Sequence, residues 1–402
     1  MSQDNMSKDN KNVHNIKKVC FVGAGTMGCY NALVAALAGF STVIYDVKSE
    51  VLQQVQAKQA EYGAILIASG YVSQEQVDTA IASVVCTDNL EQAILDADLV
   101  SESIFEQLDI KREIHQLLDQ QCDENTILTT NSSSLMVSDI ESVVKNQHRF
   151  AAFHTHLLSP LIDIVGGSNT SENTIKALTS YVERIGGVAL VLQKENPGYV
   201  LNAMIGALFA NALLLAVDQS AEFKNADFKA IDSTWMKAHN AQMGPFGMMD
   251  LFGIDVVNYG LQRNDSNAEG RSYKSQVRDF IGAFVSKGEL GVKTGVGFYQ
   301  YPEPEFKSEG FLAPNKLNDK IIQRLNSAVI NAGLLIAAKE VVPAMDVDKA
   351  WMVGMFLSSG PFALLKEMDI ETFISEPDNF VQLGTITTEE AELVKNYLSH
   401  LV

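Results

Sequence analysis

The sequence predicts an α/β N-terminal domain with a doubly wound parallel sheet, followed by an all-α region that is internally duplicated. Three observations lead to this fold class. From Ile16 to about residue 193, short β-branched runs alternate with amphipathic helical stretches, as in parallel sheets whose strands are joined by helices. A glycine-rich turn joins the first strand to the first helix. After Asn196-Pro197-Gly198 the chain becomes helical and rich in Ala, Leu and Met.

The elements of the α/β part follow in order from these patterns. Residues 17–25 form a β-branched run that ends in glycines, residues 26–40 an amphipathic helix, and residues 41–46 a second strand. A helical stretch is expected over 48–69. Because helices separate the strands, all of them should run parallel. The remaining strands are expected at 83–87, 97–103, 126–132, 149–156 and 188–193.

The helical part contains an internal repeat in which residues return at one constant offset. A duplicated helical unit explains these matches better than chance, since both tryptophans of the chain are among them. The repeated residues are Asp232, Trp235, Gly244, Pro245 and Phe246, which return as Asp348, Trp351, Gly360, Pro361 and Phe362. We therefore expect a disordered tail (1–14), a nucleotide-binding domain (15–195) and two helical domains (196–301 and 302–402).

The bulk composition argues against several classes of function. The 402 residues carry a formal charge of −19, which disfavours a nucleic-acid or anionic-membrane surface. No apolar run is as long as a membrane-spanning helix, and the N-terminal residues lack the apolar core of a secretory signal. Four scattered cysteines without a CxxC pair indicate buried, free thiols in a reducing compartment. We expect a cytoplasmic protein whose partners include no metal, membrane or nucleic acid.

The glycine-rich turn "VGAGTMG" (22–28) is typical of a dinucleotide site. Gly23, Gly25 and Gly28 allow a tight turn, the close approach of a pyrophosphate and tight packing of helix on strand. The second strand ends in Asp46, whose carboxylate can accept both ribose hydroxyls and would repel a 2′-phosphate. NAD is therefore favoured over NADP. The alternative is a glycine-rich turn that binds no ligand.

Two further segments place polar side chains at carboxyl ends of strands, where a doubly wound sheet holds its ligand. The first contains Glu102, Glu106 and Lys111, which could equally form a solvated helix face with local ion pairs. The second, "TTNSSSL" (129–135), offers Asn131 and serines to a carboxamide or a substrate oxygen. A serine at this place is also an ordinary start signal for a helix.

The expected strand 149–156 carries His154 near its end, and this histidine is either structural or a general base. His156 and Asp163 lie close in sequence and raise the question of a metal site. Ligands at that spacing in one strand and loop, with no third histidine nearby, argue against a metal.

In their order and separation, these motifs resemble the L-3-hydroxyacyl-CoA dehydrogenase family over about residues 16–301. The repeated unit at 320–375 resembles the doubled C-terminal domain of multifunctional fatty-acid oxidation enzymes. Any one motif is ambiguous, but the ordered set is specific. The motifs are "VGAGTMG" with Asp46, "ADLVSESIFEQLDIKREI", "NSSSL", "RFAAFH", "NPGYVLN", "MGPFGMMDLFGID" and "GVKTGVGFYQY".

The resemblance implies a Rossmann-type NAD-binding domain and an oxidoreductase. Hydride would pass between NAD and the hydroxyl-bearing carbon of a 3-hydroxyacyl (3-oxoacyl) thioester or a related hydroxy acid. The resemblance also implies that His154 moves the hydroxyl proton, while Ser133 and Asn202 orient the substrate oxygen. The residues expected at the cofactor are Gly23, Ala24, Gly25, Thr26, Met27, Gly28, Asp46, Ser103, Glu106, Lys111, Asn131 and Lys293.

The chain departs from the family at positions around the histidine. The family has a supporting glutamate twelve residues after the catalytic histidine, where this chain has Gly166. The usual Asn-Pro after the histidine is replaced by Leu157 and Leu158, and the usual arginine after the catalytic asparagine by Ala203. Asp163 is the nearest acid, but its odd offset from position 166 predicts that it faces the opposite side of a strand. The histidine is therefore expected to lack its supporting acid, a loss of roughly 10³–10⁴ in rate in analogous sites.

The nature of the substrate stays open at this level. The helix after Asp46 carries only Lys48 and Lys58, which offer few contacts to the 3′-phosphate of coenzyme A. A carrier-protein thioester or a smaller hydroxy acid would need no such helix. The alternatives are a catalytically impaired NAD-binding relative that acts as a binding or regulatory subunit, and a specialised-metabolite enzyme with a carrier-bound substrate. The fused helical copy allows a monomer (a pseudo-dimer) or a homodimer.

Overall fold

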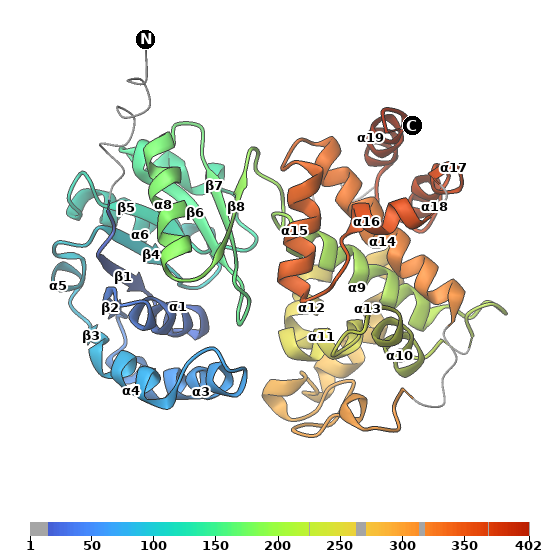
Figure 1. The fold of residues 1–402 in the computed structure, drawn as a ribbon, viewed down its shortest axis with the longest axis horizontal. Coiled ribbons are helices and arrows are strands. Elements are labelled where there is room, and N and C mark those ends of the chain that lie inside the picture. The colour runs from blue at the N-terminus through green and yellow to red at the C-terminus, as the bar shows by residue number, and fades with distance from the viewer. Residues whose placement is uncertain (1–14, 225, 263–270, 313–317, 369, 402) are drawn as a thin grey trace, which may run out of the picture. The chain divides into compact units, whose positions relative to one another are not determined.

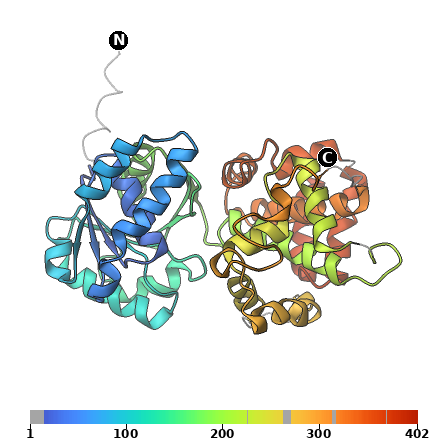
Figure 2. The same ribbon diagram turned by 90° about the horizontal axis from the view of Figure 1, so that it is seen from below.

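The computed structural model describes residues 15–224, 226–262, 271–312, 318–368 and 370–401. The tail expected to be disordered, residues 1–14, lies outside them. The chain divides into two compact units, Met1–Tyr199 and Val200–Val402, which are described separately below. The first is an α/β unit and the second is helical, so the predicted fold class is confirmed at this level (Figures 1 and 2).

The first unit is built on one eight-stranded sheet with the order β3-β2-β1-β4-β5-β6-β7-β8. The chain starts in the middle of the sheet, fills one side and then crosses to the other, which is the doubly wound arrangement. The strands are β1 (Lys18–Val22), β2 (Ser41–Tyr45), β3 (Val85–Thr87), β4 (Leu99–Glu102), β5 (Ile127–Thr130), β6 (Phe150–Thr155), β7 (Leu161–Gly166) and β8 (Val188–Leu192).

The expectation of an all-parallel sheet is wrong at one place. β6 and β7 pair antiparallel, with His154 directly opposite Asp163, and β7 then pairs parallel with β8. Only a short loop separates β6 from β7, and a short connection can join only antiparallel strands. The segment 161–166 is a buried apolar run interrupted by one acid, so alternation along the sequence does not identify it as a strand.

Helices cover both faces of this sheet (Figures 1 and 2). The stretch expected to be helical, 48–69, forms α2 and α3. A further helix, α4, was not predicted, although a capping box of Ser73 and Gln76 marks its start. The helices are α1 (Thr26–Leu37), α2 (Ser49–Leu52), α3 (Val55–Ala68), α4 (Gln74–Ser83), α5 (Leu90–Ile94), α6 (Leu108–Gln121), α7 (Val137–Ile140) and α8 (Glu172–Arg184).

In its described residues the second unit consists of helices, apart from loops, short 3-10 turns and isolated β-bridges, and its longest loop region begins after Lys287. Its longest helix, α14, is apolar enough to span a membrane, but 61% of its apolar window is buried inside the protein, as in the core helix of a soluble fold. The helices are α9 (Leu201–Val217), α10 (Phe228–His239), α11 (Pro245–Phe252), α12 (Ile254–Gln262), α13 (Tyr273–Lys287), α14 (Asp319–Ala338), α15 (Ala344–Met355), α16 (Pro361–Glu367), α17 (Ile370–Phe373), α18 (Glu376–Gln382) and α19 (Thr388–Ser399).

The residues that recur in the sequence make the same local contacts at both places, while the duplication itself stays a prediction. Asp232 accepts the backbone N–H of Phe246 at 2.8 Å, and Asp348 accepts that of Phe362 at 2.7 Å. Each aspartate therefore supplies an acceptor to the first turn of α11 or α16. The glycine before each of these helices lies against its aspartate so closely that a Cβ atom would collide with it. These contacts explain why Asp, Gly, Pro and Phe recur together.

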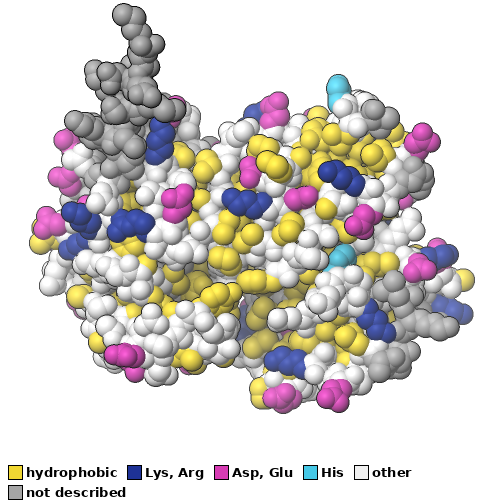
Figure 3. Space-filling model, viewed as in Figure 1, with side chains coloured by type: hydrophobic (Ala, Val, Ile, Leu, Met, Phe, Trp, Pro, Cys, Tyr) yellow, Lys and Arg dark blue, Asp and Glu magenta, His cyan; other side chains and the backbone are white. Residues whose placement is uncertain are grey.

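Two further expectations from the composition concern the surface charges and the cysteines. On the face shown in Figure 3, Lys and Arg side chains are scattered among acidic ones over the described residues. All four cysteines are free, and Cys20 and Cys29 are buried as expected. Cys86 is exposed and Cys122 is half-buried, so the expectation that all of the thiols are buried is wrong for these two.

Candidate active site

The glycine-rich turn between β1 and α1 is a cradle whose shape depends on missing side chains. Gly23 has a φ of +107°, a conformation that favours glycine, and a Cβ there would lie 2.7 Å from the carbonyl oxygen of Ser103. A Cβ at Gly28 would lie 1.8 Å from the carbonyl oxygen of Gly23. Gly25, in contrast, is exposed and has no atom within 4 Å of a built Cβ, so the space beside it is open.

The N-terminus of α1 is available to a phosphate. No side chain caps this twelve-residue helix, so the N–H groups of its first turn have no side-chain acceptor. Asp46 lies beside the turn and accepts the N–H of Ala24 at 2.9 Å and that of Lys48 at 3.0 Å. An open glycine, uncapped helix N–H groups and an adjacent carboxylate at the end of β2 fit a dinucleotide.

Glu106 organises the serine loop that follows β5. Its Oε1 atom accepts the hydroxyl of Ser132 at 2.5 Å, the hydroxyl of Ser134 at 2.9 Å and the N–H of Ser133 at 3.1 Å. Hydrogen bonds to one carboxylate thus hold three successive residues. Ser133 is exposed, and unlike its two neighbours it does not give its hydroxyl to Glu106 among the contacts of the described residues. Among these contacts its hydroxyl is therefore not used to hold the loop, and its contact with a ligand stays a prediction.

Glu106 lies next to a buried ionic cluster formed by Lys111, Glu102 and His115. The Lys111 Nζ atom lies 2.6 Å from Glu102 Oε1 and 3.4 Å from Glu106 Oε2. Glu102 also accepts the Thr130 hydroxyl at 2.7 Å, and its Oε2 lies 3.3 Å from Nε2 of His115. Burial alone would raise the pKa of Glu102, but the contacts with His115 and Lys111 outweigh it and lower the pKa to about 2. Lys111 is only 1% exposed, so a direct contact between it and a cofactor stays a prediction.

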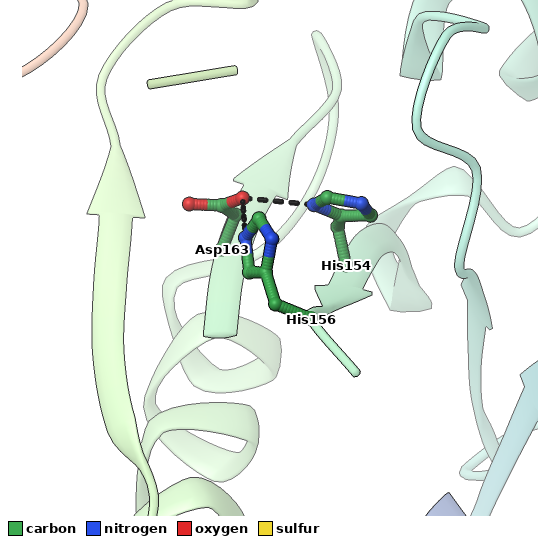
Figure 4. Close-up of side chains that lie close together, drawn as sticks. All are labelled: His154, His156 and Asp163. Atoms are coloured by element: carbon green, nitrogen blue, oxygen red, sulfur yellow. Dashed lines mark hydrogen bonds and ion pairs between the residues drawn. The ribbon is translucent and has the colours of Figure 1, made fainter. Parts of the chain in front are cut away.

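The strand end of β6 brings together a histidine pair and an acid (Figure 4). Nδ1 of His154 lies 2.9 Å from Oδ2 of Asp163, and Nε2 of His156 lies 3.0 Å from the same oxygen. His154 and Asp163 are 5% and 0% exposed. Because an ionised carboxylate only accepts, each ring donates the N–H that faces it. Nε2 of His154 then keeps its lone pair.

The expectation that Asp163 faces away from His154 is therefore wrong. That expectation used Gly166 as the reference for the face of the strand, but Gly166 lies opposite Ala151 in the antiparallel register. Asp163 lies opposite His154, and directly opposed residues of an antiparallel pair share a face of the sheet. A buried acid therefore lies beside the histidine, nine residues further along the chain rather than twelve.

Tyr199 packs against His154 from another direction. The two ring centroids are 4.9 Å apart, and the tyrosine hydroxyl donates to the carbonyl oxygen of Ser132 at 2.9 Å. Tyr199 has a φ of +51°, and its carbonyl oxygen accepts the side-chain amide of Asn196 at 2.6 Å. A non-glycine residue in this conformation is held there by its surroundings. Tyr199 thus connects the histidine to the serine loop.

The protonation states of the pair are complementary. Burial alone would raise the pKa of Asp163, but the hydrogen bonds from His154 and His156 outweigh it and lower the pKa. Burial, together with the nearby His156, lowers the pKa of His154 against the opposite influence of Asp163 and Glu106. At neutral pH the pair is therefore a neutral imidazole beside a carboxylate, which is the state of a general base.

His154, His156 and Asp163 are also of the residue types that bind metals, and their donor atoms all lie within 4.8 Å of one another. Both imidazole contacts have ordinary hydrogen-bond lengths and end on one carboxylate oxygen. Oδ2 of Asp163 is thus satisfied by the two imidazole N–H groups. We interpret it as a hydrogen-bonded trio.

The remaining predicted residues are placed as follows. Asn131 Oδ1 accepts the N–H of Thr155 at 2.7 Å, so it fixes the chain directly after His154. Asn202 lies in the first turn of α9 and is half-buried, and Lys293 forms an ion pair with Asp255. Asn202 and Lys293 belong to the second unit, and their roles stay predictions. Tyr199 was not singled out from the sequence, and His156 was considered there only as a metal ligand, whereas both lie beside His154 in the structure.

Comparisons with known proteins find matches to both units of the chain. The model of the "3-hydroxyacyl-CoA dehydrogenase, NAD binding domain" matches residues 18–196, and that of the "3-hydroxyacyl-CoA dehydrogenase, C-terminal domain" matches residues 198–301. A probable 3-hydroxyacyl-CoA dehydrogenase of Caenorhabditis elegans is 27% identical over 303 residues, which are 72% of this chain and 97% of the relative. The alpha subunit of a fatty acid oxidation complex of Idiomarina loihiensis is 26% identical over 92% of this chain, which spans 53% of that subunit.

Solved structures show the same fold. The structure of a diketoreductase, described as catalysing reactions of dicarbonyl compounds, is 29% identical with a TM-score of 0.63, over 71% of this chain and 99% of its own. The 3-hydroxybutyryl-CoA dehydrogenase of Escherichia coli has a TM-score of 0.73 over 95% of this chain and 100% of its own. At 20% identity, this second likeness concerns the fold alone.

Proposed function

Because this chain belongs to the 3-hydroxyacyl-CoA dehydrogenase family and is an NAD-dependent oxidoreductase of that type, we propose that His154 is its catalytic base. The observation that carries the proposal is the buried 2.9 Å contact between His154 Nδ1 and Asp163 Oδ2. It fixes the tautomer with a free Nε2, the nitrogen that takes the proton of the substrate hydroxyl. Asp163 then stabilises the imidazolium that forms.

The other proposed roles follow from how the side chains are held. Ser133, on the loop that Glu106 fixes, donates its hydroxyl to the substrate oxygen, and Asn202 is proposed to do so from α9. Bound NAD would supply the acceptor for the hydride. Its pyrophosphate would be held by residues 23–28 and its adenosine ribose by Asp46. The residues proposed to line the rest of the cofactor site are Ser103, Glu106, Lys111, Asn131 and Lys293.

The substrate is proposed to be a 3-hydroxyacyl thioester or a related hydroxy acid. Of the two lysines near α2 and α3, Lys58 is committed to the carbonyl oxygen of Ala24 at 3.3 Å. Among the described residues of the segment 48–69, Lys48 is then the exposed lysine that is open to a 3′-phosphate. This favours a thioester gripped by its acyl end, or a small dicarbonyl compound, over tight recognition of the nucleotide half of coenzyme A.

The test compares NADH consumption with acetoacetyl-CoA, acetoacetyl-pantetheine and free acetoacetate, with His154→Ala as the inactive reference. We expect turnover by the wild type that the variant lacks, and kcat/KM for the pantetheine thioester within about tenfold of that for the CoA ester. A CoA ester preferred by 100-fold or more would contradict the substrate proposal. Binding of NADH without turnover of any of the three would favour the alternative, an NAD-binding regulatory subunit.

The acid side of the pH profile follows from the pKa of His154. Since burial lowers the pKa of His154 below the ordinary value of about 6.5, more than half of the imidazole is neutral at pH 6.5. Oxidation of the hydroxyl needs the neutral base, so the midpoint of the acid limb of kcat/KM for oxidation should lie below pH 6.5. Initial rates between pH 5 and 8 would show this. A midpoint above pH 6.5 would be the opposite result.

We also propose that the helical region is a pseudo-dimer within one cytoplasmic chain. Helix α9 packs on α14, α10 contacts α14 and α15 contacts α9, so the contacts are reciprocal between the two copies of the repeat. The rings of the two repeated tryptophans, Trp235 and Trp351, lie 6.4 Å apart at 90°. Reciprocal contacts of equivalent residues are what a two-fold axis produces. A monomer is therefore favoured over a homodimer.

A further inference from the structure

The second histidine of the trio has no place in the mechanism so far. His156 is two residues after His154 and therefore lies on the same side of the chain. The ring centroids of the two histidines are 4.4 Å apart, with an angle of 75° between the planes. Both rings end on Oδ2 of Asp163, while Oδ1 is buried without a partner among the described residues. One carboxylate oxygen thus serves two imidazoles (Figure 4).

We propose that His156 is a positioning residue, which holds Asp163 by a second N–H and shares its negative charge so that His154 remains an uncharged base. The inference rests on the proposed function, because it concerns the same base. Asp163 is the side chain that touches both rings. His156 therefore acts on His154 through the carboxylate.

The orientation of Asp163 depends on this second donor. The side chain of Asp163 is short. His154 and His156 donate to the same carboxylate oxygen from two directions. Tilting the carboxylate away from His154 would lengthen the bond to His156 as well. Two donors to a single buried acceptor therefore restrict it more than one. Charge-assisted hydrogen bonds of this kind are about twice as strong as neutral ones.

The charged groups around His154 explain why the charge of Asp163 has to be shared with His156. Two carboxylates favour the imidazolium of His154, Asp163 from β7 through its hydrogen bond and charge and Glu106 from the loop before α6 through its charge. Tyr199 faces it with a phenol that stays neutral, because burial raises the pKa of that hydroxyl far above its ordinary range. Among these groups, His156 is the one that opposes the carboxylates. Without it, His154 would hold a proton more tightly and be a poorer acceptor at neutral pH.

The test uses two variants of position 156. His156→Phe keeps a ring but donates no N–H, whereas His156→Gln keeps an amide N–H that can reach Oδ2. For His156→Phe we expect kcat/KM for oxidation at pH 7 to fall about tenfold, the size typical for a group that acts through a neighbour. The acid limb of its profile should move to higher pH. His156→Gln should recover most of the rate and bring the limb back toward the wild-type position.

A readout independent of turnover separates this inference from the proposed function. The ¹⁵N signals of labelled histidine report the protonation of His154 in the protein with NADH bound, assigned by comparison with His154→Gln. The midpoint of His154 should rise in His156→Phe whether or not a substrate has been found. If acetoacetyl compounds are not turned over while this shift appears, the proposed function fails and the inference about the trio stands.

Three outcomes would overturn the proposal. In the first, both variants lose activity equally and keep the wild-type acid limb, which means that His156 only fills space. In the second, the His154 signal of His156→Phe is unchanged or moves to a lower midpoint. In the third, the wild-type profile changes on adding EDTA or Zn²⁺ at micromolar concentration, which would make the trio a metal site.

Discussion

Replacing Asp163 by asparagine should lower kcat by about 10³–10⁴ while leaving the binding of NADH unchanged. The asparagine amide can donate an N–H toward Nδ1 of His154, which favours the tautomer with its proton on Nε2. That tautomer cannot accept the hydroxyl proton. Stopped-flow or steady-state measurement of NADH formation checks the rate, and NADH fluorescence checks the cofactor site.

The pH profile adds a second signature for this variant. Asp163 raises the pKa of His154, against burial and His156, which lower it. Removing the carboxylate charge should therefore lower the pKa further and move the acid limb of the residual activity to lower pH. A variant that was merely misfolded would lose NADH binding as well. An Asp163→Asn enzyme with wild-type kcat would show that Asp163 is not the acid that supports His154.

A matched control addresses the position at which a supporting acid was expected. In the double variant Asp163→Asn with Gly166→Glu, the new carboxylate starts opposite Ala151, on the face of the sheet away from His154. A Cβ there would lie 3.1 Å from Cβ of Thr170. We expect no recovery of kcat. Recovery by more than tenfold would mean that a carboxylate at residue 166 reaches the histidine, contrary to the register of β6 and β7.

The histidine site shows what sequence reasoning can and cannot supply. His154 was identified from its place at the end of a strand and from the surrounding motifs. Its partner was missed because a count along the chain contains no information on strand pairing. The antiparallel register of β6 and β7 places Asp163 opposite His154 although the two residues are nine positions apart and not twelve. The signal that could have found it was the apolar run 161–165 with an acid at its centre.

The cofactor side was easier to predict because its chemistry depends on local structure. Gly23, Gly25 and Gly28 act within one strand–turn–helix unit, and the turn that they imply is present. The family resemblance places Glu106 at the cofactor, which stays a prediction, and in the structure Glu106 holds the serine loop. Its partners lie 26 to 28 residues away in sequence, and only the pairing of β4 with β5 brings them together. Interactions across strands require the sheet order, which the sequence pattern does not contain.

Replacing Lys111 by methionine should lower the free energy of unfolding by about 3–5 kcal/mol, because it leaves Glu102 buried without its cation. The two side chains are 1% and 0% exposed. Lys176→Met is the matched control, since Lys176 pairs with Glu172 on the surface, where the two side chains are 60% and 89% exposed. For the control we expect a loss of about 0.5 kcal/mol or less. Urea unfolding of the three proteins at pH 7 provides the comparison.

The pH dependence of this loss identifies its cause. In the wild type the pKa of Glu102 is about 2, below its ordinary value near 4.5, so its stabilising contribution is complete above pH 4.5 and is lost as the pH falls toward 2. In Lys111→Met the buried carboxylate takes up a proton at higher pH, which relieves the unpaired charge. The difference in stability should therefore shrink as the pH is lowered from 7 to 4. Two results would contradict this account: equal losses of stability for Lys111→Met and Lys176→Met, or a difference in stability that does not change with pH. Either would mean that Lys111 is not the cation that compensates Glu102. The serine loop and Glu106 would then not depend on this buried pair.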